Sequence, residues 1–237
     1  MLPVFPLGTK KDVTTSREPW PPWPAPSFDP ERVYAAIGGS AEPVPRFCTG
    51  FPREPYGDDI ALKLAGAGGD GAQTAAMLIA RAAINEGFDA THIPSYGPES
   101  RGGTSHADVR IAEAEVLSPA APAPHLLVAF NAPSLAKFGP AVAPGGTVIY
   151  DRSVVPEPPD LPDALRVLGI PATEMARDLG APLVKNIVAL GALQGATHLL
   201  PEETFLTALR QALRDKGALL SLNEQAFRRG VEAGGAP

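Results

Sequence analysis

An apolar segment, a run of glycines and a helix of small residues follow one another between residues 60 and 87. Ile60–Gly66 reads IALKLAG, which predicts a buried strand, and Gly66–Gly71 then forms a tight turn. Ala72–Glu86 predicts a helix that ends at Gly87. A strand that passes through a tight turn into a helix is typical of a sheet covered by helices.

The same alternation continues along the chain. Further strands are expected near Ala90–Pro94 and at Ala107–Ala112, Leu126–Phe130, Thr147–Asp151 and Arg166–Ile170, and further helices at Pro133–Phe138, Ile187–Ala196 and Glu202–Lys216. Gly217 is expected to follow the last of these helices, and Ser221-x-x-Glu224 predicts the capping box of a final one. The expected fold is therefore α/β: a three-layer, Rossmann-like parallel sheet with helices on both faces.

Residues 1–57 differ in composition from the rest of the chain. They hold twelve of the 28 prolines and both tryptophans, Trp20 and Trp23, so ordinary helix is not expected there. A disordered tail would also be rich in proline, but such tails are poor in aromatic residues. This stretch carries six more: Phe5, Phe28, Tyr34, Phe47, Phe51 and Tyr56. We favour an extended, proline-rich strap that docks on another subunit, ahead of a globular domain at 58–237.

Charge, hydropathy and cysteine content exclude several classes of protein. The net charge of −6, without a cluster of Lys and Arg, argues against a nucleic-acid partner. The apolar runs are too short to cross a membrane, and the N-terminus lacks the order of a signal peptide, so the cytoplasm is the expected compartment. Cys48 is the only cysteine, so this chain cannot hold an iron–sulfur cluster alone. The four histidines lack metal-ligand spacing.

The turn Gly66–Gly71 matches the dinucleotide-binding pattern G-x-G-x-x-G. Such a site also needs an acid at the end of the second strand, where this chain has Ser95 and Tyr96 instead. A tight turn with no ligand is therefore an equal alternative. Gly69-Asp-Gly71 is similar to the start of a thiamine-diphosphate motif, but the Asn that completes that motif is missing. We find no nucleophile elbow, catalytic triad or metal ligand set.

Six segments together resemble the gamma subunit of pyruvate, 2-oxoisovalerate and 2-oxoglutarate:ferredoxin oxidoreductases, between about Ile60 and Gly230. They are GAGGDGAQTAAMLIARAA (66–83), PSYGPESRGGTSHADVRI (94–111), LLVAFNAPSLAKF (126–138), GGTVIYD (145–151), KNIVALGAL (185–193) and NEQAFRRG (223–230). The second segment is the most specific. The order and spacing of all six make a chance resemblance unexpected.

This resemblance implies a chain that is not catalytic alone. It would assemble with alpha-, beta- and delta-type subunits into a complex that oxidises a 2-oxoacid and forms an acyl-coenzyme A. The complex would use thiamine diphosphate, Mg²⁺, iron–sulfur clusters and coenzyme A, and it would reduce ferredoxin or a similar acceptor. The gamma subunit would contribute to the coenzyme A site and to assembly.

The candidate cofactor-binding residues lie on the two glycine-rich loops and at the starts of two helices: Gly68, Gly69, Tyr96, Gly97, Glu99, Arg101, Gly102, Asn131 and Asn186. Arg101 could pair with a coenzyme A phosphate, with Glu99 or with a partner subunit, since a guanidinium suits all three. The glycines of this loop are expected to shape it. Asn131 is expected to be structural, and Asn186 to be a helix cap or a ligand contact.

The chain departs from the family pattern in three places. Asp70 stands where the family usually has Gln, and its negative charge argues against a phosphate at that turn. A Pro-rich link, Pro119–Pro124, leads to His125 where the family commonly has an acid, and the strap at 1–57 is not part of the usual gamma pattern. Two alternative functions remain: a free-standing NAD- or nucleotide-binding protein, and a purely structural assembly subunit.

Overall fold

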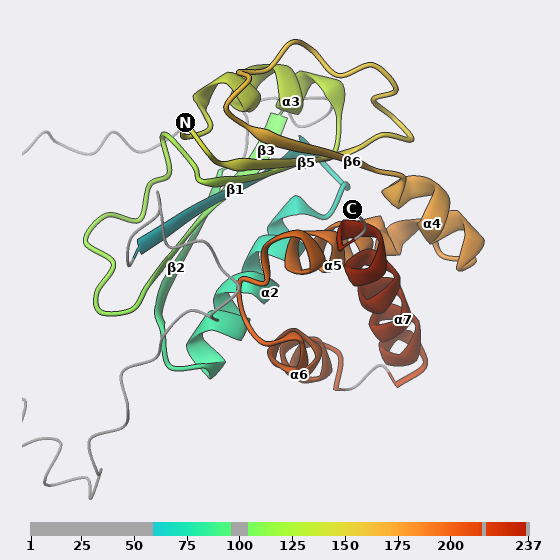
Figure 1. Ribbon diagram of the computed structural model, residues 1–237. Coiled ribbons are helices and arrows are strands. Elements are labelled where there is room, and N and C mark those ends of the chain that lie inside the picture. The colour runs from blue at the N-terminus through green and yellow to red at the C-terminus, as the bar shows by residue number, and fades with distance from the viewer. Residues whose placement is uncertain (1–58, 96–103, 215–216, 236–237) are drawn as a thin grey trace, which may run out of the picture. The chain divides into compact units, whose positions relative to one another are not determined.

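The computed structural model describes residues 59–95, 104–214 and 217–235 (Figure 1). The strands are β1 (Asp59–Ala67), β2 (Asp89–Ser95), β3 (Thr104–Ala112), β4 (Leu126–Ala129), β5 (Thr147–Asp151) and β6 (Arg166–Ile170). The helices are α2 (Ala72–Asn85), α3 (Ala132–Phe138), α4 (Ala172–Asp178), α5 (Lys185–Thr197), α6 (Glu202–Ala212) and α7 (Gly217–Gly234), with short 3₁₀ turns at Gly139–Ala141 and Pro182–Val184. The predicted strap at 1–57 and the loop 96–103 lie outside the described residues.

The six strands form one sheet in the order β2-β3-β1-β4-β5-β6. β1, β4, β5 and β6 pair in parallel, whereas β3 is antiparallel to both of its neighbours, β1 and β2. The sheet is therefore mixed and mostly parallel, so the prediction of a purely parallel sheet was wrong at β3. The physical reason is the short link at 96–103, because a parallel connection needs a crossover of a dozen or more residues.

Helices cover both faces of the sheet, which gives the predicted three layers. Alternate residues of β1, namely Ile60, Leu62 and Leu64, face the larger apolar core under α2, α5, α6 and α7. On the other face, α3 contributes Leu135 to a smaller core with Leu127 of β4. Figure 1 shows α3 on one side of the sheet and the remaining helices on the other.

α5 is buried along nearly its whole length, from Asn186 to Thr197. A helix that is apolar on all sides belongs in a core, and α7 packs against it backbone to backbone. A Cβ built on Gly195 of α5 would lie 2.1 Å from the Val231 carbonyl oxygen of α7, and one on Gly230 of α7 would lie 2.1 Å from the Val188 oxygen. Only glycine permits so close an approach at these positions.

The C-terminal helices differ from the sequence prediction at three points. α6 ends at Ala212 and not at Lys216. α7 begins at Gly217, so Ser221 lies inside the helix and the predicted capping box was wrong. Glu224, its other member, forms ion pairs with Arg210 and Arg228 instead. The sequence also did not predict α4. None of the helices in the described part of the chain is long and apolar enough to cross a membrane.

Candidate functional site

The glycine turn Gly66–Gly71 lies at the point where the chain changes direction across the sheet. From β1 the chain first builds β2 and β3 on one side, and then crosses to β4 on the other side. β1 and β4 are parallel, with Ala65 opposite Ala129, so their carboxyl ends meet at one edge of the sheet. Open α/β sheets bind ligands at such a switch point. This carboxyl edge of the sheet is the candidate functional site.

The turn is closed by its own carboxylate. The Ala67 N–H donates to Asp70 Oδ2 at 2.6 Å, and the Asp70 N–H donates to the Ala67 carbonyl at 3.1 Å. A Cβ on Gly66 would lie 2.7 Å from Asp70 Oδ2, so glycine is required there. Gly68 and Gly69 are exposed, and a Cβ built on either meets nothing within 4 Å. Their backbone is therefore open to a ligand or to a partner chain.

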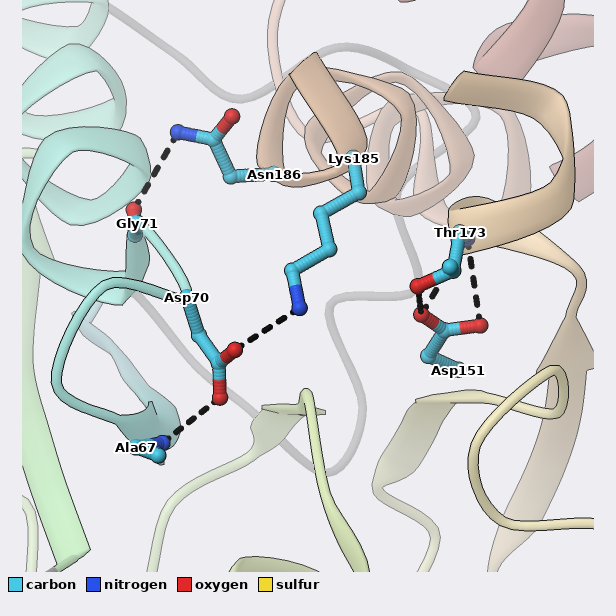
Figure 2. A network of polar contacts seen from close by, with 7 residues as sticks. All are labelled: Ala67, Asp70, Gly71, Asp151, Thr173, Lys185 and Asn186. Carbon is cyan, nitrogen blue, oxygen red and sulfur yellow. Dashed lines mark hydrogen bonds and ion pairs between the residues drawn. The ribbon is translucent and has the colours of Figure 1, made fainter. Parts of the chain in front are cut away.

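Asp70 also links the turn to the start of α5. Lys185 Nζ lies 2.7 Å from Asp70 Oδ1, and the two side chains are only 19% and 17% exposed (Figure 2). Asn186 Nδ2 donates to the Gly71 carbonyl at 3.3 Å. A Cβ on Gly71 would lie 2.6 Å from that amide nitrogen, so the turn and α5 are in direct contact.

This arrangement disfavours a phosphate at the turn. Helix N-termini that follow glycine turns commonly bind anions, but a phosphate here would face the Asp70 carboxylate, which already uses the Ala67 N–H and Lys185. The Asp70 carboxylate is thus held at the turn, where it would repel a phosphate. The turn offers backbone groups and an internally neutralised charge, which suit an uncharged polar ligand.

Asn131 and Asn186 have structural contacts. Asn131 is the N-cap of α3: its Oδ1 accepts a hydrogen bond from the Ser134 N–H at 2.9 Å, as an N-cap should. Asn186 is buried behind the glycine turn, and it does not cap α5, whose N-cap residue is Val184. Direct contact of either residue with a ligand stays a prediction.

A buried carboxylate at the end of β5 was missed by the sequence analysis. Asp151 accepts hydrogen bonds from the Thr173 hydroxyl at 2.5 Å and from the Thr173 N–H (Figure 2). It also accepts one from the Ser153 N–H. α4 starts after Pro171, which has no side-chain acceptor, so Asp151 satisfies a first-turn N–H from a neighbouring strand. An Asp directly after an apolar strand was the signal that could have identified it.

The strand order differs from that of a dinucleotide-binding site. In that fold the strand after the first helix lies beside β1 and supplies the acid that binds ribose. Here β3 separates β2 from β1, and β2 ends at Ser95 with no acid. Gly66–Gly71 thus matches G-x-G-x-x-G, but β1 does not have beside it the strand whose acid binds ribose in a dinucleotide site.

The predicted residues Tyr96, Gly97, Glu99, Arg101 and Gly102 lie outside the described residues. The residues that flank this segment are placed: Ser95 pairs with His106, which pairs with Ala65, and Thr104 pairs with Ala67. β2 therefore ends, and β3 begins, at the same edge of the sheet as the glycine turn.

The described residues contain no group of three or more His, Cys, Asp or Glu side chains that could hold a metal ion.

The rings of His106 and Phe138 are in contact, with centroids 4.9 Å apart. The centroid of the Phe138 ring also lies 5.1 Å from the Nζ of Lys63 and from that of Lys137. Burial lowers the pKa of His106, and the charge of Lys63 lowers it further. Lys63, in the same cluster, is paired with Asp108.

Residues 61–233 match the family described as pyruvate ferredoxin/flavodoxin oxidoreductase. The ketoisovalerate oxidoreductase subunit VorA of Methanothermobacter thermautotrophicus is 37% identical over 181 residues, which cover 76% of this chain and 37% of VorA. The match therefore spans little more than a third of that relative's length.

Two solved structures share the fold. The gamma subunit of a keto/oxoacid ferredoxin oxidoreductase from Geobacter sulfurreducens is 30% identical, with a TM-score of 0.63 and coverage of 74% of this chain and 98% of that one. The 2-oxoglutarate:ferredoxin oxidoreductase from Magnetococcus marinus, with 2-oxoglutarate, coenzyme A and succinyl-CoA bound, is 26% identical, with a TM-score of 0.69 over 75% of this chain and 31% of that one. The resemblance seen in the six sequence segments is confirmed: the chain belongs to the pyruvate ferredoxin/flavodoxin oxidoreductase family, as a gamma-type subunit.

Proposed function

We propose that this chain is the gamma-type subunit of a thiamine-diphosphate-dependent 2-oxoacid:acceptor oxidoreductase, and that it works only within the complex. The complex converts a 2-oxoacid to an acyl-coenzyme A and reduces ferredoxin or a similar acceptor in the cytoplasm. The observation that carries the proposal is the match to 98% of the length of a separate gamma subunit. The relatives are named for different 2-oxoacids, ketoisovalerate and 2-oxoglutarate, so the proposal leaves the acid at the level of its class.

The residues of this chain do not fit two of the expected cofactors. An iron–sulfur cluster needs about four thiolates, and Cys48 is the only cysteine. The Mg²⁺ that accompanies thiamine diphosphate is held by oxygen ligands, and the described residues contain no group of three or more His, Cys, Asp or Glu side chains that could hold a metal ion. We therefore assign both cofactors to the alpha-, beta- and delta-type partner subunits, and no step of their chemistry to this chain.

For coenzyme A we propose a division of roles at the carboxyl edge. Arg101, on the loop that begins and ends at this edge, would bind a phosphate, because a guanidinium makes charge-assisted pairs with phosphate oxygens. The exposed backbone of Gly68 and Gly69 would lie against the uncharged pantetheine arm, since Asp70 disfavours a phosphate there. Tyr96, Gly97, Glu99 and Gly102 would complete the loop. The related Magnetococcus marinus enzyme, solved with coenzyme A bound, supports a coenzyme A role.

The two alternatives make different predictions. A free-standing dinucleotide-binding protein is disfavoured by the position of β3 between β1 and β2. A purely structural subunit would assemble normally. Substitutions in its loop 96–103 would then leave the affinity of the complex for coenzyme A unchanged.

The proposal is tested by purifying the chain alone and with the other subunits encoded beside it. The chain alone should contain no stoichiometric iron or thiamine and should have no 2-oxoacid oxidoreductase activity. The co-expressed complex should contain both cofactors and should form acyl-coenzyme A. Iron or thiamine in the isolated chain, or failure of any other subunit to co-purify with it, would contradict the proposal.

A further inference from the structure

A groove runs between α2 and α6. Two adjoining hollows of about 490 and 340 Å³ share Met77 and Arg81 of α2 and Gln211 of α6. Arg214 lines the first hollow, and Ile84 and Asn85 line the second. Because the two hollows share these residues, they form one continuous surface, which we call the α2–α6 groove.

The groove has an exposed apolar part on α2. Met77 and Ile84 are 38% and 58% exposed, although α2 buries its opposite face in the core. With Arg81 between them, their spacing places all three side chains on one stripe of the helix. Methionine and arginine are both enriched at protein interfaces. This stripe has the composition of a docking surface.

On a chain whose net charge is −6, the groove presents the cationic side chain of Arg81, which lines both hollows. Among the described residues that line the two hollows there is no carboxylate. Within the described residues Arg81 has no hydrogen bond or ion pair, whereas Arg210, nearby in α6, is neutralised by Glu203 and Glu224. Asn85 Nδ2 donates to Gln211 Oε1 at 3.2 Å and joins the two walls. The groove therefore complements a segment that carries a carboxylate.

We propose that the α2–α6 groove docks an acidic segment of another subunit of the oxidoreductase complex, with a carboxylate on Arg81 and apolar side chains on Met77 and Ile84. This inference rests on the proposed function. A second copy of this chain fits less well, because a two-fold interface pairs the same patch with itself and would bring the Arg81 groups of both copies together. Along α2, Met77 and Ile84 lie roughly 9 and 20 Å from Gly71, at 1.5 Å per residue. The groove is thus an assembly surface set back from the carboxyl edge.

The test uses the co-expressed complex and compares Arg81→Glu with Arg177→Glu, a charge reversal at an exposed position of α4. Arg81→Glu should weaken assembly about 30-fold or more, as expected of an interface hot spot, whereas Arg177→Glu should assemble like the wild type. The double variant Met77→Ser/Ile84→Ser should weaken assembly without a change of charge. Thermal unfolding of each free variant checks that the domain still folds.

A photoreactive residue in place of Ile84 then identifies the occupant. A cross-linked peptide from another subunit, with an Asp or Glu whose change to Lys restores assembly of Arg81→Glu, supports the inference. A cross-link to a second copy of this chain, or normal assembly of a folded Arg81→Glu variant, overturns it. If the wild-type chain binds no other subunit, the proposed function fails as well; normal assembly of both wild type and Arg81→Glu overturns the groove alone.

Discussion

The carbonyl oxygen of Phe227, in α7, occupies the space that a Cβ on Gly191, in α5, would need: a Cβ built there lies 2.0 Å from that oxygen. Gly195 of α5 and Gly234 of α7 have the same relationship to backbone oxygens of the partner helix. The two helices therefore contact each other through their main chains. They can approach this closely because Gly191, Gly195 and Gly234 have no side chains.

Gly191→Ala should destabilise the domain. Alanine favours helix by about 1 kcal/mol over glycine, but here the new methyl group meets a backbone oxygen that cannot rotate away. Overpacking of this kind costs about 1–3 kcal/mol or more, so we expect a net loss of about 2 kcal/mol in the free energy of unfolding. The matched control is Gly217→Ala at the start of α7, where a Cβ meets nothing within 4 Å and stability should not fall. Urea unfolding that gives equal stability for both variants would contradict the described contact.

The Asp70–Lys185 pair should show a measurable coupling energy. Both side chains are mostly buried, so the pair is less screened than a surface pair, and we expect about 1 kcal/mol. A double-mutant cycle with Asp70→Asn and Lys185→Met measures it, since Asn keeps an oxygen that can accept from the Ala67 N–H. The control cycle uses Arg228 and Glu224 of α7, a longer contact of 3.6 Å with an arginine that is 50% exposed, which should couple by at most about 0.5 kcal/mol. Coupling no larger than the control would mean that the pair does not hold α5 to the turn.

His125 should make stability depend on pH. Burial lowers its pKa from the ordinary value of 6.5, the charge of Arg110 lowers it further, and the charge of Asp59 opposes this by raising it. The Ala61 N–H donates a hydrogen bond to Nδ1 of the ring at 3.0 Å. The folded state therefore binds fewer protons than the unfolded state just below pH 6.5. The contribution of His125 to the free energy of unfolding is complete above pH 6.5. It is lost as the pH falls from 6.5 toward the pKa of the folded state, by up to about 1.4 kcal/mol per pH unit.

His125→Asn isolates this effect, because the Asn oxygen can replace Nδ1 as the acceptor and does not titrate. Unfolding free energies measured between pH 7.5 and 5 should fall more steeply for the wild type than for the variant. His92 and His106, whose pKa values burial also lowers, are present in both proteins and cancel in the comparison. Parallel curves would show that the pKa of His125 is the same in the folded and unfolded states.

Arg101→Ala should raise the Michaelis constant of the complex for coenzyme A about tenfold, since loss of a charge-assisted pair costs roughly 1.5 kcal/mol. The Michaelis constant for the 2-oxoacid should stay near that of the wild type. Arg177→Ala is the control, because this arginine is exposed on α4. An unchanged constant for coenzyme A in an intact complex would give Arg101 a structural role and favour the assembly-only alternative.

Replacing Trp20 and Trp23 with Ala should weaken assembly of the complex while the domain at 58–237 keeps its thermal stability. Buried aromatic residues dominate the energy of protein interfaces, and prolines reduce the entropy that an extended strap loses on docking. Size-exclusion chromatography of the reconstituted complex measures the effect. Normal assembly of the double variant, or proteolytic removal of residues 1–57 without consequence, would mean that the strap does not bind other subunits.

Most strands and helices could be predicted because their signals are local. The strand at β1 and the helix α2 follow from an apolar run and a glycine turn, and both are observed. The antiparallel direction of β3 could also have been predicted from the local sequence, because the link at 96–103 is too short for a parallel crossover. We expected a uniformly parallel sheet instead.

The missed features depend on residues that are far apart in the chain. α4 begins after a proline with no capping side chain, and the acceptor for its first turn is Asp151, in another strand. The bond between Asp70 and Lys185 joins positions 115 residues apart, so no motif predicts it. Ser221 and Glu224 matched a capping box, but Glu224 pairs with Arg210 of α6, and tertiary contacts decided where α7 starts.

The contact between α5 and α7 also sets an order of events during synthesis on the ribosome. α5 is apolar on all sides, and one of its sides is covered by α7, the last helix that the structure describes. α7 follows α5 in the chain, so that side of α5 stays uncovered until α7 has also left the exit tunnel. The nascent chain thus carries an exposed apolar helix between the emergence of α5 and that of α7, and termination before α7 would release a polypeptide prone to capture by chaperones or to aggregation.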